Sequence, residues 1–149
     1  MTLSCPYCSS PAKLVGGGVV YPHRQDSRWL AAKKFWICIP CNAWVGCHPG
    51  TKTPLGRLAN AELRRAKQAA HDVFDPLWEA KMRRDKCKKH EARGAAYRWL
   101  SKELGTPFEE THIGMFDVSQ CNRVVEVCVK IYDSAKRKRG EVMLEGVRK

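Results

Sequence analysis

The sequence contains no long apolar run and no recognisable export signal. No stretch of the 149 residues approaches the roughly 18 consecutive apolar residues that a membrane-spanning helix needs. Residues 1–6 lack the basic segment and apolar core of a secretory signal peptide. We therefore expect no membrane partner and a cytoplasmic location.

Motifs of known catalytic chemistry are also missing. The chain has no HNH, HExxH or paired-aspartate motif. The weak candidates are His71, Asp72 and Asp75, which share about one helical turn and could be joined in space by His48 and His112. A metal-dependent nuclease is the weaker alternative that they leave open. We expect structural histidines, no enzyme activity and no small-molecule substrate.

Acidic residues are scarce relative to basic ones. The chain has 15 Asp and Glu against 27 Lys and Arg, a net charge of +12. Residues 51–93 alone carry twelve basic side chains against six acidic ones. A positive field of this kind attracts polyanions, so nucleic acid (DNA or RNA, including ribosomal RNA) is the first partner to expect. The alternative is that the charge only keeps the protein soluble.

Eight cysteines are present, and four of them form two C-x2-C pairs. Cys5 and Cys8 make the first pair, Cys38 and Cys41 the second. In a reducing compartment such pairs indicate metal ligation rather than disulfides or redox chemistry, which are the alternatives. Four soft thiolates favour zinc and leave no open position for water, so we predict one structural Zn²⁺.

Residues 1–50 are predicted to be a zinc-ribbon module, because a segment this short needs a metal to stabilise its fold. The glycines at positions 16–18 suggest a hairpin turn. The predicted antiparallel strands are residues 13–15, 19–21, 34–37 and 43–46.

Residues 51–149 are predicted to be a basic helical region of about three helices, which makes the fold class α+β. The first helix follows the turn-rich residues 49–56 and has Asn60 as a plausible cap. Asp75 and Pro76 are expected to restart the helical pattern, which then runs to Gly105.

Within that second run a break is possible at Gly94, and a last helix is predicted beyond it. Asp117 and Gln120 have the spacing of a capping box for this last helix. The basic residues 136–140 are expected to close it. On its apolar stripe, Cys121 and Cys128 are predicted to be small buried hydrophobes.

Several short sequence segments together resemble those of a known family. They include Cys38–Cys41 followed by residues 45–51, then residues 54–60, 71–78, 96–100 and 112–117. The chain resembles, over residues 5 to about 128, a family of small phage and prophage proteins called zinc-finger-containing, whose function is unassigned. The resemblance implies a phage origin, hence the host cytoplasm, and a zinc-ribbon start. It implies no catalytic residues.

The roles of His48, His71 and His112, which match histidines of that family, stay open, as do those of Cys47 and Cys87. For nucleic acid, we expect Trp29, Phe35, Trp36 and Trp44 to offer rings beside basic groups, unless they only cover the zinc site. The predicted nucleic-acid contacts are Arg24, Arg28, Lys33, Lys34, Arg64, Arg65, Lys81, Arg83, Arg84, Lys88 and Lys89.

The leading functional hypothesis is therefore an accessory or regulatory nucleic-acid-binding protein. The alternative is a protein-interaction module that binds a host machine, such as RNA polymerase, the ribosome or a defence complex, because zinc ribbons serve either purpose.

Overall fold

The computed structural model describes residues 2–24 and 26–148, with side chains as far as Lys138. The chain divides into two compact units. Unit 1 comprises Met1–Arg65 with Gly114–Phe116, and unit 2 comprises Ala66–Ile113 with Asp117–Lys149. The first division of the chain thus falls after residue 65, whereas the sequence suggested residue 50.

Backbone pairing explains why residues 51–60 belong to unit 1. The Leu55 amide donates to the Gly46 carbonyl at 2.8 Å. Trp44 and Ala59 exchange two backbone hydrogen bonds of 3.0 and 3.1 Å. The connector is therefore tied to the last strand along most of its length, and it cannot act as a free linker.

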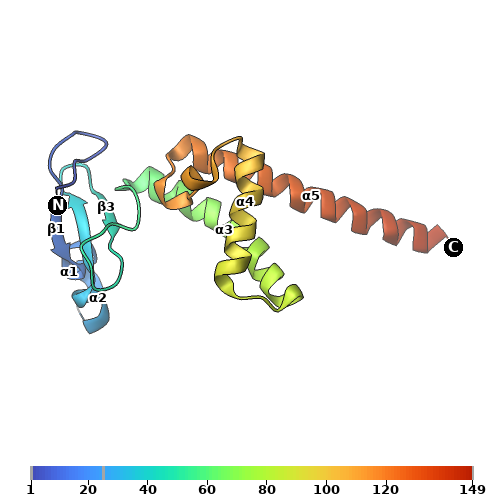
Figure 1. The fold of residues 1–149 in the computed structure, drawn as a ribbon, viewed down its shortest axis with the longest axis horizontal. Coiled ribbons are helices and arrows are strands. Elements are labelled where there is room, and N and C mark those ends of the chain that lie inside the picture. The colour runs from blue at the N-terminus through green and yellow to red at the C-terminus, as the bar shows by residue number, and fades with distance from the viewer. Residues whose placement is uncertain (1, 25, 149) are drawn as a thin grey trace. The chain divides into compact units, whose positions relative to one another are not determined.

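A three-stranded antiparallel sheet forms the centre of unit 1 (Figure 1). Its strands are β1 (Lys13–Gly16), β2 (Lys34–Cys38) and β3 (Ala43–Gly46), in the order β1-β2-β3. The two strands predicted around the second cysteine pair are thereby confirmed.

β2 is covered on both faces because its side chains alternate between two small cores. Trp36 and Cys38 belong to one core, together with Cys5 and Leu58 among others. Phe35 and Ile37 belong to the other core, which includes Val20 and Leu30. A strand that is buried on both faces has a continuous run of apolar residues, and residues 35–38 form such a run.

The predicted strand at residues 19–21 is wrong. Residues Gly17–Val20 form the short helix α1, and β1 pairs with β2 instead. Gly17 is needed for close packing rather than for a turn, because a Cβ at this position would collide with the backbone of Leu30. Leu30 lies in a second short helix, α2 (Arg28–Ala32), which the sequence pattern did not indicate.

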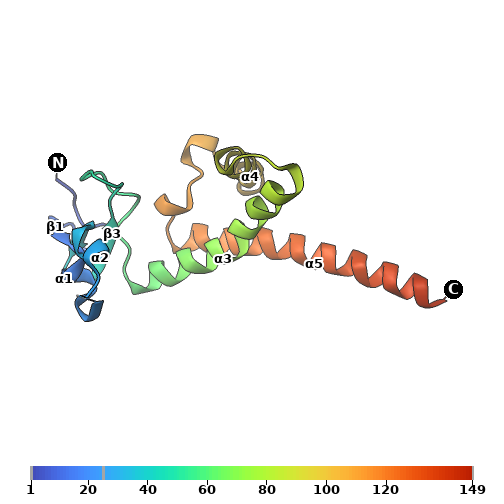
Figure 2. The same ribbon diagram turned by 90° about the horizontal axis from the view of Figure 1, so that it is seen from below.

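Unit 2 is helical and contains three long helices in the described part of the chain. They are α3 (Ala61–Asp85), whose first turn still belongs to unit 1, α4 (Lys89–Leu104) and α5 (Val118–Arg148). α4 runs across α5 rather than along it (Figures 1 and 2). The expected α+β fold with about three helices is confirmed.

The helix ends are partly as predicted. Asn60 caps α3 through its side-chain oxygen, which accepts from the Leu63 amide at 3.0 Å. Asp117 and Gln120 form a reciprocal capping box, with bonds of 2.8 and 2.9 Å. Gly105 ends α4 in the left-handed conformation.

Three other boundaries differ from the prediction. α3 does not restart at Asp75, and Pro76 lies inside it. The break falls instead after Asp85, where Lys86 adopts a positive φ of 50°, so Gly94 is interior to α4. The basic residues 136–140 do not close α5, whose backbone continues to Arg148.

The core of unit 2 explains why α3 tolerates its proline. Ala70 and Phe74 precede Pro76 and Trp78 follows it, and all three are buried. The Phe74 ring packs against Tyr97 of α4 with ring centroids 4.7 Å apart. Burying a large apolar side chain such as Phe74 contributes roughly 1.5–3 kcal/mol, which offsets the missing backbone hydrogen bond.

The predicted burial of Cys121 and Cys128 is confirmed, since neither side chain is exposed. Among the described residues, no helix combines the length and the apolar character that crossing a membrane requires.

Candidate metal centre

The first cysteine pair lies in a tight loop whose backbone is hydrogen-bonded to itself. The Cys5 amide donates to the Ser10 carbonyl at 2.8 Å, and the Ser9 amide donates to the Cys5 carbonyl at 2.9 Å. Ser9 closes the loop with a φ of 63°. The Tyr7 amide points at the Cys5 sulfur at 3.4 Å. The loop thus turns both sulfur atoms to one side.

The second pair occupies the turn between β2 and β3. Cys38 is the last residue of β2, and the Asn42 amide donates to the Ile39 carbonyl at 3.1 Å. Asn42 has a φ of 50°, a conformation that asparagine tolerates better than most residues. The central strand β2 therefore positions the second cysteine pair beside the first pair.

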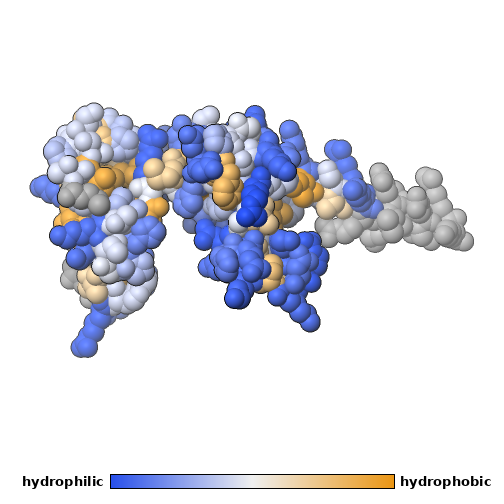
Figure 3. All heavy atoms as spheres, in the orientation of Figure 1, coloured by the Kyte–Doolittle hydropathy of each residue, from blue (hydrophilic) through white to orange (hydrophobic). Residues whose placement is uncertain are grey.

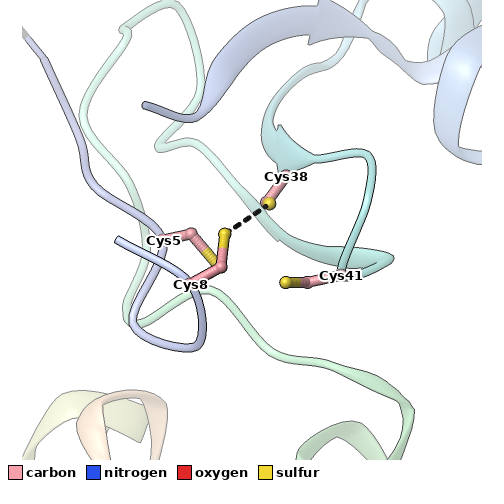
Figure 4. A group of neighbouring side chains, drawn as sticks. All are labelled: Cys5, Cys8, Cys38 and Cys41. Carbon is pink, nitrogen blue, oxygen red and sulfur yellow. Dashed lines mark hydrogen bonds between the residues drawn. The ribbon is translucent and has the colours of Figure 1, made fainter. Parts of the chain in front are cut away.

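The four sulfur atoms converge (Figure 4). All lie within 4.8 Å of one another, and the Cys8 and Cys38 sulfurs are 3.6 Å apart. A tetrahedral zinc with Zn–S bonds of about 2.3 Å places its sulfurs about 3.8 Å apart. The donor set fits this ion in both number and spacing, and Cys5, Cys8, Cys38 and Cys41 hold one structural Zn²⁺.

Burial is uneven around the centre. Cys5 and Cys38 are buried, Cys41 is half-buried and Cys8 is exposed. Hydrogen bonds from Ser10 lower the pKa of Cys8 to about 6. Hydrogen bonding with Cys8, together with burial, raises the pKa of Cys41 to about 12. Four thiolates this close repel one another, so a bound cation is what allows all of them to ionise together.

Tyr7, in the spacer of the first pair, joins that pair to the segment leading into α3. Its hydroxyl donates to the Leu58 carbonyl at 3.4 Å and accepts from the Asn60 amide at 3.2 Å. Leu58 itself is buried against Cys5 and Cys38. The first knuckle and the start of α3 are thus linked through one side chain.

Arg64 joins the second knuckle to the same helix. Its guanidinium lies 3.4 Å from the centroid of the Trp44 ring. It also donates to the carbonyls of Asn42 and Ala59, at 3.0 and 2.6 Å. Partial burial lowers the pKa of Arg64, although the group stays charged at neutral pH. Arg64, predicted as a nucleic-acid contact, therefore has its guanidinium engaged within unit 1.

Three of the four aromatic rings proposed for base stacking are also engaged. Phe35 and Trp36 are buried, and the Trp36 indole donates to the Lys52 carbonyl at 2.7 Å. Trp44 is half-buried beneath Arg64. Trp29 differs, because 72% of it is exposed. The expectation of stacking rings is thus corrected to Trp29 alone.

The remaining predicted contacts fall in three places. Arg24, Arg28, Lys33 and Lys34 lie around α2 in unit 1. Arg65 is exposed one residue beyond Arg64. The third place is the end of α3 and the start of α4, where the structure places Lys81, Arg83, Arg84, Lys88 and Lys89.

The histidine and aspartate candidates do not assemble as one group. His71 lies 3.2 Å from Asp75, whose same oxygen accepts from the Trp78 indole at 3.0 Å. Asp72 accepts instead from Gln68 at 2.8 Å. His112 stacks on Tyr97, with ring centroids 5.8 Å apart. Within the described residues, the four cysteines are the one group of three or more ligand residues spaced for a metal.

The zinc ligands were visible from spacing, but the side chains that support them were not. Nothing in the local sequence relates Arg64 to Trp44 or Tyr7 to Asn60, because each pair meets only after the sheet has formed. Three consecutive glycines are typical of a hairpin turn, but here Gly17 and Gly18 begin the short helix α1.

A comparison with protein families agrees with this geometry. A family model described as a zinc-finger-containing domain matches residues 1–131. Searches of curated proteins and of solved structures returned no match. The family match spans both the cysteine cluster and most of the helical unit. The chain therefore belongs to the zinc-finger-containing domain family.

Proposed function

We propose that this protein binds nucleic acid through exposed basic side chains and acts as an accessory or regulatory factor rather than as an enzyme. The closed shell of four thiolates supports the non-catalytic part of this proposal, because it offers no position for a substrate or water. The zinc centre is a scaffold, and binding is assigned to the surface around it and to unit 2. The phage origin that the resemblance implies remains an expectation.

The observation that carries the proposal is the basic turn, which we define as residues 81–93. α3 ends and α4 begins here, and the side chains of Arg83, Lys86, Lys88 and Lys89 are exposed. Figure 3 shows a largely hydrophilic surface over this turn. Long cationic side chains on the outside of a helical corner can reach phosphates from several directions.

Few carboxylates neutralise the basic turn. Lys81 and Arg84 both pair with Asp85, at 2.8 and 3.1 Å. These two contacts hold the pKa of Asp85 down at about 2. In the part of the chain that the structure describes, the ion pairs involve no other predicted nucleic-acid contact. The charges of Arg83, Lys86 and Lys88, which are exposed and outside these ion pairs, are therefore available to an external anion.

The test is fluorescence anisotropy with labelled single-stranded and duplex DNA and RNA over a series of salt concentrations. We expect affinity to fall steeply with salt, because phosphate contacts release counterions. Replacing Arg83 and Lys88 by Gln should reduce the magnitude of the log–log slope by about 0.7–0.9 for each phosphate that is no longer neutralised.

The matched control is Lys102→Gln, an exposed cation in the last turn of α4 outside the basic turn. It should change the slope less than either variant of the turn. Failure of the wild-type protein to bind any oligonucleotide at low salt would overturn the proposal. Cleavage of the probes that disappears in His71→Ala would instead support the nuclease alternative.

A second candidate function, a protein-interaction module, is favoured by a different surface of unit 2. α4 and α5 border a cavity of about 470 Å³ whose lining includes Trp99, Val127 and Ile131. Val129, Ile131 and Tyr132 of α5 are large apolar side chains that remain exposed. Capture of a host protein that survives nuclease treatment and is abolished in Ile131→Ser would favour this candidate.

A further inference from the structure

A second concave surface lies in unit 1, around α2 and the segment after β3. This cavity has a volume of about 350 Å³, within the range of small-ligand pockets. Its lining includes Trp29, Lys33, Lys34, His48 and Gly50. We call it the Trp29 cavity.

The exposure of Trp29 follows from how α2 is anchored. Ser27 caps this helix by accepting from the Leu30 amide at 3.2 Å, and Leu30 is buried against β2. Because Leu30 points into the core, its neighbour Trp29 is directed outward. A fixed backbone thus holds the ring at the surface. Because 72% of Trp29 is exposed, its side chain contributes little buried area to the stability of unit 1.

The cavity carries positive charge and no acidic side chain in its lining. The Lys33 ammonium lies 5.1 Å from the centroid of the Trp29 ring, and Lys34 is exposed at the start of β2. The floor includes Cys47, whose thiol is buried. An occupant that suits this lining has a flat apolar face for the ring and an anionic group for the two lysines.

An unpaired nucleotide has both features. Its base can stack on an indole, and its phosphate can contact neighbouring lysines. A base within a duplex already has both faces covered by its neighbours. We propose that the Trp29 cavity receives one unpaired nucleotide of single-stranded DNA or RNA, with the base on Trp29 and an adjacent phosphate at Lys33 and Lys34. This inference rests on the proposed nucleic-acid binding and specifies its substrate class.

The test compares a short labelled oligothymidylate, the matching oligouridylate and a blunt-ended two-stranded duplex, all by anisotropy. Trp29→Ala should weaken binding of the single strands by about 5- to 150-fold, the range found when the stacking of one base is removed. Binding of the blunt-ended duplex should change little. Trp29→Phe keeps an aromatic platform and should recover part of the affinity.

Phe108→Ala is the matched control, an exposed aromatic residue in unit 2 that is not part of the cavity lining. It should leave single-strand affinity unchanged. Lys33→Gln tests the phosphate contact separately, and it should reduce the magnitude of the salt slope for single strands by about 0.7. Zinc content and thermal melting of each variant show whether the fold is retained.

The outcomes separate this inference from the proposed function. If Trp29→Ala binds single strands as tightly as the wild type while Arg83→Gln with Lys88→Gln weakens binding, the cavity assignment fails and nucleic-acid binding stands. If the wild type binds no oligonucleotide but binds an acidic, aromatic peptide in a Trp29-dependent way, both are overturned. Equal weakening of single-strand and duplex binding in Trp29→Ala would also contradict a site for an unpaired nucleotide.

Discussion

At the scale of single residues, Arg64 is held more tightly than its neighbours. Its guanidinium contacts the Trp44 ring and two backbone carbonyls, all within unit 1. We expect Arg64→Ala to destabilise unit 1 by about 1–3 kcal/mol, because the substitution removes a charged donor and a cation–π partner together. Chemical denaturation followed by tryptophan fluorescence measures the change.

Arg65 provides the control, since it is exposed and adjacent in sequence. Arg65→Ala should lie within about 0.5 kcal/mol of the wild type. Arg64→Lys should recover only part of the stability, because an ammonium cannot reproduce the planar stacking and the forked donors. Equal effects at the two positions would show that the contacts of Arg64 contribute nothing to stability.

The buried thiol of Cys128 makes the stability of unit 2 depend on alkaline pH. Burial raises the pKa of this thiol to about 11, whereas an unfolded cysteine titrates near 8.5. The folded chain keeps the proton over a range in which the unfolded chain has released it. Stability from this group is therefore complete below about pH 8.5 and falls as the pH rises towards 11.

The measurement is the free energy of unfolding between pH 7.5 and 10.5 for the wild type and for Cys128→Ala. The variant should be less stable at neutral pH, because it leaves a small cavity, and its pH dependence should be flatter. Burial also raises the pKa of Tyr97 and Tyr132, and the charge of Cys128 raises that of Tyr132 further, so the difference between the two proteins reports Cys128 together with its effect on Tyr132. Parallel pH curves would contradict the assignment.

At the scale of elements, α5 depends on its capping box. Asp117 accepts from the Gln120 amide, and Gln120 accepts in return from the Asp117 amide. We expect Asp117→Ala to cost about 1 kcal/mol, because one of the first helical amides is left without its partner. Ser119→Ala, at an exposed position in the same turn, should change stability by a few tenths of a kcal/mol at most, in the stabilising direction. Thermal melting at 222 nm compares them.

An element could be predicted from the sequence where the residues that determine it are close together in the chain. The caps at Asn60 and Asp117 depend on residues three positions apart, and the sequence shows them directly. The zinc ligands are equally visible, because two C-x2-C pairs need only converge. In contrast, Gly17 is required by Leu30, a residue that approaches it only in the folded unit. Pro76 indicates a helix start in the sequence, because the burial of Phe74 and Trp78 around it is visible only in the fold.

The same distinction between local and long-range contacts applies to the candidate nucleic-acid surface. The cationic segments around α2 and in the basic turn can be located in the sequence, but the sequence does not show which aromatic rings remain exposed. Trp44 and Trp29 look equivalent in the sequence. One packs under Arg64, and the other is directed outward by the burial of Leu30.

At the scale of the whole molecule, the two units should respond differently to removal of zinc. Unit 1 has small cores arranged around the cysteines, whereas unit 2 has its own helical core. We expect a strong chelator, or Cys38→Ser, to unfold unit 1 and to leave most of the helical circular dichroism signal. Zinc binding contributes on the order of 10 kcal/mol to folding in small zinc domains.

Hydrogen exchange resolves the two units in this experiment. Amides of β2 and β3 should lose protection in the metal-free protein, while those of α4 should keep it. Cys87→Ser, a half-buried cysteine outside the metal group, is the control and should retain both zinc and protection. Protected β2 amides in a zinc-free protein would show that the metal does not hold unit 1 together.

The path of the chain between the two cysteine pairs has a consequence for variation. Residues 9–37 leave the metal at one knuckle and return to it at the other, and they contain α1, α2 and the exposed Trp29. Their ends are clamped by the ion, and lengthening a closed loop costs only about 0.6 kcal/mol for each doubling. Recognition can therefore diverge at exposed positions such as Trp29, while Leu30 and Gly17, which pack together, and the metal ligands stay the same.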